Sequence, residues 1–307
     1  MLANADDWVE MEVFGKEHED FLRNYLELPN GIPSHDTIQR VFAIVPSEFL
    51  ENFQKRWNEM FNSDEGNKIK RLLAIDGKSQ RGNSSKSQKD NHIVSAADER
   101  GFCLGQKRME EKTNEIKAIP GLLDCLNIKG TIITTDAMGS QTAIVKKIHQ
   151  KWADYVLAIK TNQGNLLEEV RLYFADSECL QKTSIKRQWD LKTIILTRNT
   201  IIGAEGKESR EERYFISRLP LGIEKIACTV RGHWMVESYH WHLDVTFWED
   251  GNHTLETQAA YNLNIMRKLS LNILKLIEIK NKALSLKKRR YAIGTNPEKH
   301  LEQIINL

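Results

Sequence analysis

The sequence has 307 residues, of which 40% are hydrophobic and 28% are charged. These proportions are typical of globular proteins and exclude a chain that is disordered throughout. The formal net charge of +2 neither supports nor excludes a nucleic-acid partner, because phosphate contacts depend on a local basic surface.

The chain shows no sign of export or membrane insertion. No apolar run of about 18 residues occurs, and the first residues do not resemble a signal peptide, so we expect a cytoplasmic protein without a membrane partner. The four cysteines are scattered, with no C-x-x-C pair. This pattern indicates buried thiols in a reducing compartment, and neither zinc nor disulfides.

Residues 1–66 predict a small N-terminal helical region. Helices are expected over residues 6–28, from Ser34–Asp36 onwards, and again from Pro46–Ser47. The last of these carries apolar residues at helical spacing, which predicts a buried face: Phe49, Phe53, Trp57 and Met60. Three short helices this close together fit either a packed cap or a DNA-reading module, and the residues alone leave both open.

Two later segments predict buried strands that end in an aspartate. Leu72–Asp76 is followed by Gly77, which would let the backbone turn away, and Thr131–Thr135 is followed by Asp136. One such carboxylate commonly caps the next turn. Two at one edge of a sheet instead indicate a metal site, because hard cations prefer oxygen ligands.

The order of the elements expected within residues 67–286 is strand, strand, strand, helix, strand, helix, strand. This order predicts an α/β fold with an RNase H-like mixed five-stranded sheet flanked by helices. The first and fourth strands of such a sheet are neighbours, so Asp76 and Asp136 would meet. A β-rich insertion at about residues 164–218 interrupts the scheme before the last helix. Residues 287–307 predict a basic C-terminal tail in solvent.

The segment Val230–Asp244 predicts a helix with a line of ionisable side chains beside a line of tryptophans. The ionisable line consists of His233, Glu237, His240 and Asp244. We expect the tryptophans to pack in the core and to hold the helix against the sheet: Trp234, Trp241 and Trp248. The two histidines are about 10 Å apart along the helix axis, which disfavours a shared zinc ion.

Glu237 is the residue of this helix that we expect at the metal site. Its tryptophan neighbours would place it against the sheet, where it would join Asp76 and Asp136 around one or two Mg²⁺ or Mn²⁺ ions. Asp244 is the alternative third carboxylate, and the pattern assigns no role to His240.

Several segments are similar to the DDE transposases of bacterial insertion sequences, specifically the ISAs1 family, which includes the H-repeat-associated proteins. The matching stretches, in the family's order, are AIDGKSQRG, TNEIKAIPGLLDCL, TTDAMGSQ, DYVLAIKTNQGNL, RYFISRLP and RGHWMVESYHWHLDVTFWED. The resemblance implies an RNase H-like catalytic fold, Mg²⁺-dependent DNA cleavage, and joining of a transposon 3′-hydroxyl to target DNA. It also implies double-stranded DNA as partner, at the transposon ends and the target, with a homodimer in the DNA complex at the nucleoid.

The resemblance assigns roles residue by residue. Asp76 and Asp136 match the family's two catalytic aspartates, and Glu237 matches its glutamate. Contacts to DNA phosphates or ends are implied for a further set: Lys160, Asn162, Arg231 and His233.

The sequence also departs from the family pattern. It begins with what resembles the family's interior, and the region around Ala175–Trp189 looks shorter than in the family. These departures predict an N-terminally shortened chain with impaired activity. Two alternatives to an active transposase therefore remain: an inactive or co-opted DNA-binding remnant, and a metal-dependent nuclease without strand transfer.

Overall fold

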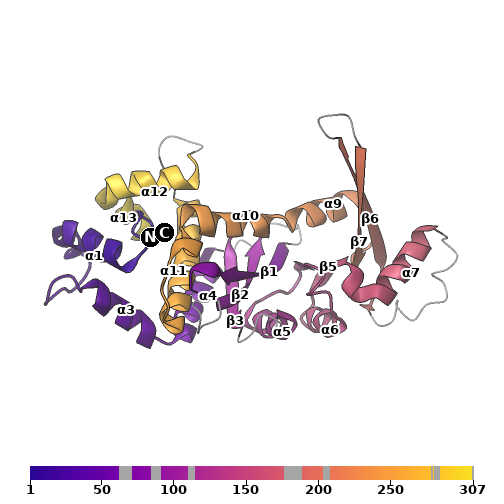
Figure 1. Cartoon of the computed structure of the whole chain (residues 1–307), viewed down its shortest axis with the longest axis horizontal. Coiled ribbons are helices and arrows are strands. Elements are labelled where there is room, and N and C mark those ends of the chain that lie inside the picture. Colours follow the sequence, from indigo (N-terminus) through magenta and orange to yellow (C-terminus); the bar gives the residue numbers. More distant parts are fainter. Residues whose placement is uncertain are drawn as a thin grey trace.

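The computed structural model describes residues 1–61, 71–83, 91–109, 115–175, 189–202, 208–277, 279 and 284–305. Figure 1 shows an elongated molecule, with a group of helices at one end and a sheet flanked by helices toward the other. Both termini lie within the helical end. Within the described ranges, no helix is long and apolar enough to cross a membrane.

The centre of the molecule is a mixed sheet of seven strands in the order β3-β2-β1-β4-β5-β7-β6. Its strands are β1 (Leu72–Gln80), β2 (Asn91–Asp98), β3 (Cys103–Met109), β4 (Ile132–Thr135), β5 (Asp154–Ile159), β6 (Thr193–Ile202) and β7 (Glu208–Ser217). Strand β1 pairs antiparallel with β2 and parallel with β4, which in turn pairs parallel with β5. The predicted adjacency of the first and fourth strands is confirmed, and the arrangement is consistent with an RNase H-like fold.

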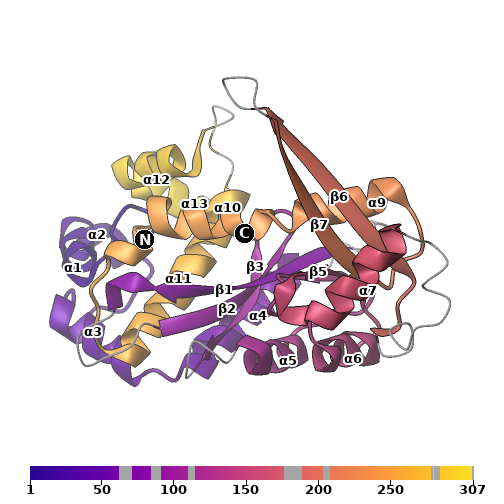
Figure 2. The same ribbon diagram turned by 45° about the vertical axis from the view of Figure 1, so that its right-hand side comes forward.

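The prediction of five strands is wrong in number, because the β-rich segment after β5 joins the main sheet. Leu157 of β5 pairs with Ile216 of β7 in antiparallel register, and both side chains are fully buried. Burial of these apolar side chains favours continuing the sheet over forming a separate one. Beyond this paired part, β6 and β7 extend as a hairpin that projects from the body of the molecule (Figure 2).

Helices cover the two faces of the sheet, as Figure 1 shows. Helices α5 (Glu115–Cys125) and α6 (Thr142–Gln150) lie on one face, while α9 (Ile223–Gly232) and α10 (Met235–Trp241) lie on the other. Strand residues alternate between the faces. Leu73 and Ile75 join the core cluster with α5 and α6, whereas Ala74 joins the cluster with α10. Helix α7 (Gly164–Ala175) follows β5.

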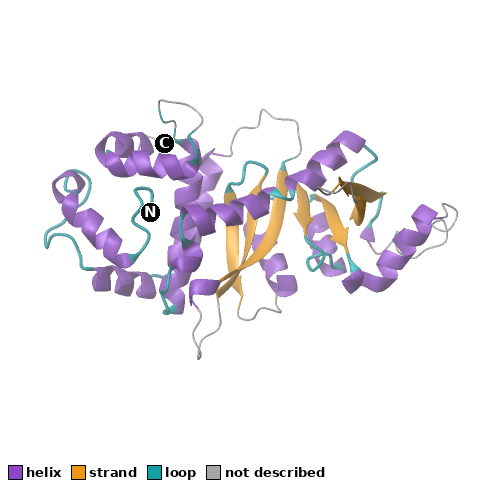
Figure 3. Cartoon of the chain, turned by 45° about the horizontal axis from the view of Figure 1, so that its top comes forward, coloured by secondary structure: helices purple, strands orange, loops and turns teal. Residues whose placement is uncertain are grey.

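The helical end is organised around the long helix α11 (Thr257–Leu276), which Figure 3 shows beside the sheet. The N-terminal helices are α1 (Trp8–Glu17), α2 (Glu19–Leu22), α3 (His35–Ile44) and α4 (Ser47–Phe61). The predicted start of α3 is confirmed, because the Ser34 side chain accepts a hydrogen bond from the Thr37 N–H. The helix expected over residues 6–28 is divided at His18 into α1 and α2.

Helix α4 turns its apolar side outward, which contradicts the buried face predicted from its spacing. Phe49, Phe53 and Met60 are 67%, 50% and 70% exposed. Its polar side is buried instead: the Asn58 side chain donates to the Cys103 carbonyl at 2.8 Å and accepts from Asn272 at 3.0 Å. Hydrogen bonds with β3 and α11 therefore decide the orientation of this helix.

The C-terminal segment also differs from the solvated tail that its charges predict. It forms α12 (Leu286–Thr295) and α13 (Pro297–Ile305), and the Arg290 side chain is buried. The Arg290 guanidinium donates to the Asp6 carboxylate at 2.5 Å and to the Met1 carbonyl at 2.8 Å. Because these oxygens satisfy the guanidinium, its burial is tolerated.

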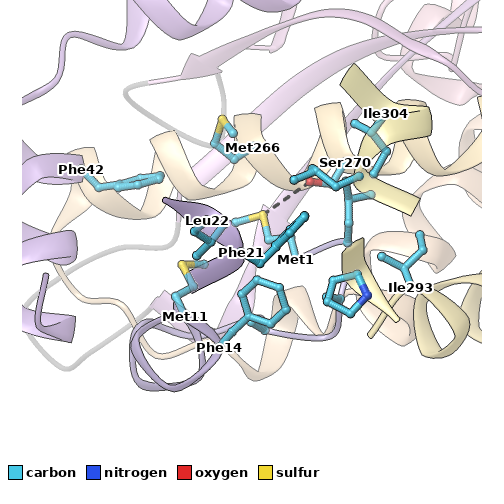
Figure 4. Close-up of a pocket in the computed structure, with 15 residues that line it drawn as sticks. Met1, Met11, Phe14, Phe21, Leu22, Phe42, Met266, Ser270, Ile293 and Ile304 are labelled. Atoms are coloured by element: carbon cyan, nitrogen blue, oxygen red, sulfur yellow. Dashed lines mark hydrogen bonds between the residues drawn. The ribbon is translucent and has the colours of Figure 1, made fainter. Parts of the chain in front are cut away.

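An apolar pocket of about 320 Å³ lies between the N-terminal helices and α11–α13. Figure 4 shows Met1, Phe21 and Ile304 among the side chains that line it. The pocket involves none of the predicted site residues, which lie at the sheet.

Candidate active site

Strands β1 and β4 bring the two predicted aspartates together. Ile75 and Thr135 are paired residues of the parallel register, so Asp76 and Asp136 follow on strands spaced about 4.8 Å apart. Alternation places both on the α9–α10 face, because Ala74 packs with α10 and the Thr134 hydroxyl lies 3.0 Å from Nδ1 of His233.

Asp76 lies where β4 ends, and its own strand continues. Strand β1 runs on to Gln80, with Gly77 paired to Val94 of β2. The prediction that the chain turns away at Gly77 is therefore wrong. The missing side chain serves close packing instead: a Cβ on Gly77 would lie 2.8 Å from the carboxyl carbon of Glu115.

Helix α10, which carries Glu237, lies against β1 and β2. Val236 and Tyr239 are fully buried and anchor the helix, while Glu237 lies on its exposed side. His240, one turn further, has Nδ1 3.5 Å from Oδ2 of Asp76. Burial lowers the pKa of His240 to about 3, with the charges of Lys268 and Lys78 acting in the same direction. The imidazole beside Asp76 is therefore neutral at physiological pH.

The pKa of the Asp76 carboxyl group reflects its burial and the charges around it. Burial raises the pKa of Asp76 to about 7, and the charges of Asp136, Glu115 and Glu237 add to the increase. A carboxylate whose charge is opposed by burial and by acidic neighbours is suited to a divalent cation, which prefers oxygen ligands and would neutralise it. Within the described part of the chain, no three His, Cys, Asp or Glu side chains lie close enough together to hold a metal ion. The carboxylates near Asp76 are nevertheless the type of ligand that Mg²⁺ or Mn²⁺ prefers.

A tight turn after β4 fixes Asp136. Its carboxylate accepts from the Gly139 N–H at 3.1 Å. A Cβ on Gly139 would lie 2.7 Å from Cβ of Thr135, so only glycine fits this close approach. The Asn162 side chain donates to the Ala137 carbonyl at 2.8 Å and holds the same turn from the end of β5.

The residues predicted to contact DNA divide into two groups. Lys160 and Arg231 are exposed, whereas His233 is mostly buried, with Nδ1 3.0 Å from the Thr134 hydroxyl. Burial lowers the pKa of His233 against the opposing charge of Asp136. Asn162 is exposed, but its side-chain amide donates to the Ala137 carbonyl in the turn after β4.

Asp244, the alternative third carboxylate, belongs to a different cluster. Lys78 donates to Asp244 and, at 2.6 Å, to Glu249. Glu249 is fully buried, and the charges of Lys78, Lys268 and Arg267 outweigh its burial and lower its pKa to about 2. This cluster joins β1 to the segment after α10 and to α11, and so fixes the position of α10 over the sheet.

The tryptophans of α10 and its extension do not pack in the core as predicted. Trp234, Trp241 and Trp248 are 46%, 55% and 59% exposed, and the guanidinium of Arg213 lies 4.8 Å from the Trp234 ring centre. The buried line consists of Val236, Tyr239, Leu243 and Phe247. Its spacing of three to four residues and the seven-residue spacing of the tryptophans each describe one side of a helix, so periodicity cannot tell which side faces inward.

Three residues at or near the site escape the sequence prediction. His240 stands three residues after Glu237, a spacing that places both on one side of a helix. Glu249 follows the predicted helix as one acid among several, and Glu115 opens an ordinary amphipathic helix. These two carry no local signal.

The fold and the acidic centre define an α/β protein whose carboxylates gather where a central strand ends. Residues 67–273 match the family model described as "Transposase DDE domain", and residues 1–58 match the model described as "DDE_Tnp_1-associated". The chain belongs to the family of DDE transposases of insertion-sequence-type mobile elements.

Several relatives come from Escherichia coli, and two of them match nearly the whole chain. "H repeat-associated putative transposase YhhI" of strain K12 is 34% identical, covering 96% of this chain and 87% of its own length. "Putative transposase YncI" of O157:H7 is 33% identical, covering 96% of this chain and 84% of its own length. "H repeat-associated putative transposase YbfD" of K12 is 43% identical, covering 54% and 66%.

Proposed function

We propose that this protein is a transposase of the ISAs1 type that cleaves DNA and transfers the cut strand. The observation that carries the proposal is the pairing of β1 with β4 up to Ile75 and Thr135, which supports a side-by-side position for Asp76 and Asp136. Glu237 of α10, whose charge helps to raise the pKa of Asp76, would supply the third carboxylate.

Asp76, Asp136 and Glu237 are the residues that would hold Mg²⁺ or Mn²⁺. When bound, such ions stabilise the charge that develops as one oxygen displaces another at phosphorus. The surrounding protein would position the carboxylates. The Gly139 N–H holds Asp136, and the neutral ring of His240 lies beside Asp76 without adding a positive charge that would compete with the cation.

Double-stranded DNA is the proposed partner, at the element's ends and at the target. The exposed cations Lys160 and Arg231 are suited to phosphate contacts. His233 and Asn162 would instead support the site indirectly. His233 contacts the Thr134 hydroxyl, and Asn162 donates to the turn after Asp136. We also propose that the protein acts in the cytoplasm and as a homodimer on DNA.

We also propose a division of the chain into three parts. Residues 1–66 form the helical region and residues 67–286 the RNase H-like catalytic unit, with residues 287–307 as a C-terminal segment. The two family models, which match residues 1–58 and 67–273, support the first boundary.

A strand-transfer assay tests the function. The full chain is incubated with labelled duplexes of the element's own end sequences, a target plasmid, and Mg²⁺ or Mn²⁺. Cleaved ends joined to the target support the proposal. Metal-dependent nicking without joined products would indicate a nuclease, and salt-sensitive DNA binding without cleavage would indicate an inactive remnant.

A further inference from the structure

A carboxylate lies behind the catalytic strand, on the face of the sheet opposite Asp76. Glu115 opens helix α5, and its carboxyl group packs against Cα of Gly77. Gly77 faces the α5 side, as Leu73 and Ile75 of the same strand do. Any side chain at this position would push the carboxylate away. The absence of a side chain at Gly77 therefore allows the Glu115 carboxylate to pack directly against the backbone of β1.

Two further side chains fix Glu115 in this place. Nε2 of His92 lies 2.6 Å from the Glu115 carboxylate, and its Nδ1 lies 2.7 Å from the Ser79 hydroxyl. The ring of His92 thus links the Ser79 hydroxyl to the Glu115 carboxylate through its two nitrogens. The side chains of His92 and Glu115 are only 9% and 14% exposed, so water competes little for these hydrogen bonds.

The position of Glu115 matters for Asp76. Its carboxyl group packs on Gly77, the residue that follows Asp76 in β1, so its charge lies close to Asp76 on the other side of the strand. This charge can act across one strand because the intervening protein screens poorly and Gly77 keeps the separation short.

We propose that Glu115 is a positioning residue of the acidic centre: the chain Ser79–His92–Glu115 holds a fourth carboxylate behind β1 and strengthens the hold of Asp76, Asp136 and Glu237 on a divalent cation. The inference rests on the proposed function, because it assumes that these three residues bind the ion. Glu115 acts from the opposite face and is not itself a ligand.

Direct binding of Mn²⁺ tests this role without DNA or catalysis. The full chain is titrated with Mn²⁺, and free ion is followed by electron paramagnetic resonance, for wild type, Asp76→Asn and Glu115→Gln. Asp124→Asn is the matched control, because Asp124 lies at the other end of α5 in a surface pair with Lys147 at 2.6 Å.

We expect Glu115→Gln to bind the same number of ions about tenfold more weakly, with Asp124→Asn unchanged. Wild-type affinity in Glu115→Gln, together with loss of binding in Asp76→Asn, would overturn this inference alone. Loss of a whole ion in Glu115→Gln would also overturn it, since Glu115 would then be a ligand. Wild-type binding in Asp76→Asn would overturn the proposed metal site as well.

A conservative variant covers the case in which Glu115→Gln does not fold. Glu115→Asp keeps the charge but withdraws it from Gly77 by one methylene group. Weaker Mn²⁺ binding in this variant supports the requirement for placement, and wild-type binding contradicts it. Circular dichroism confirms that each variant is folded before titration.

Discussion

Ile75 of β1 and Thr135 of β4 are paired in parallel register, and β4 ends at this pair while β1 continues to Gln80. The acidic centre follows from this difference in length. Asp76 is supported by β2 on one side and is free of a strand partner on the side of β4. The aspartate on each strand can therefore face helix α10 without being enclosed by the sheet.

The Lys78–Glu249 pair should dominate the stability of the region around α10. Glu249→Gln leaves Lys78 and Lys268 with one buried carboxylate fewer, so we expect a loss of about 3–5 kcal/mol in the free energy of unfolding at pH 7. Urea unfolding measures the difference. The hydrogen bonds from Asn264 and Gln80 to Glu249 cannot replace the lost charge.

The stability difference between wild type and Glu249→Gln should depend on pH. The folded-state pKa of Glu249, about 2, lies below its ordinary value of 4.5. Its stabilising contribution is therefore present above pH 4.5 and is lost as the pH falls toward 2. The stability difference between wild type and Glu249→Gln should narrow over this range. A difference that stays constant down to the acid limit would contradict the assignment.

Gly139 should be sensitive to a single added methyl group. Gly139→Ala places a Cβ within 2.7 Å of Thr135 and shifts the N–H that holds Asp136, so we expect a loss of about 1–3 kcal/mol of stability. Gly164→Ala is the control, because a Cβ there has no neighbour within 4 Å. Thermal unfolding measures both variants. Equal stability of the two would contradict the close packing assigned to Gly139.

The outward orientation of the tryptophans can be tested by truncation. Trp241→Ala removes a half-exposed ring and should change stability by less than about 0.5 kcal/mol. Phe247→Ala removes a fully buried ring and should cost about 3–5 kcal/mol. The opposite ranking in urea unfolding would show that the tryptophan line faces the core.

Long-range pairing could be predicted where apolar runs are continuous. The runs before Asp76 and Asp136 and the order of elements between them are sufficient to make β1 and β4 neighbours. The orientation of α4 could not be predicted, because polar contacts made across the fold outweigh its local periodicity, and that of α10 could not, because both of its sides carry apolar residues at helical spacing. The partners of Asn58 are distant in sequence: the carbonyls of Cys103 and Leu104 and the side chain of Asn272.

The same limit applies to parts of the site. Glu115 and Glu249 gain their roles from partners that are remote in sequence, at His92 and Lys78. The role of Gly77 could not be predicted, because a glycine that allows a turn and a glycine that allows close packing look alike in sequence. Two of the described cysteines, Cys125 and Cys228, are exposed, which contradicts the prediction of buried thiols.

The most direct test of the central claim is DNA cleavage by Asp76→Asn. Cleavage of end-sequence duplexes in Mg²⁺ or Mn²⁺ should fall by more than about a hundredfold relative to wild type, because the variant loses a ligand. The folded-state pKa of Asp76, about 7, lies above its ordinary value, so its charge opposes folding at pH 8. In the absence of metal, the variant should therefore unfold at the same or a higher temperature at that pH. A folded Asp76→Asn protein that cleaves at the wild-type rate would contradict the assignment of the acidic centre.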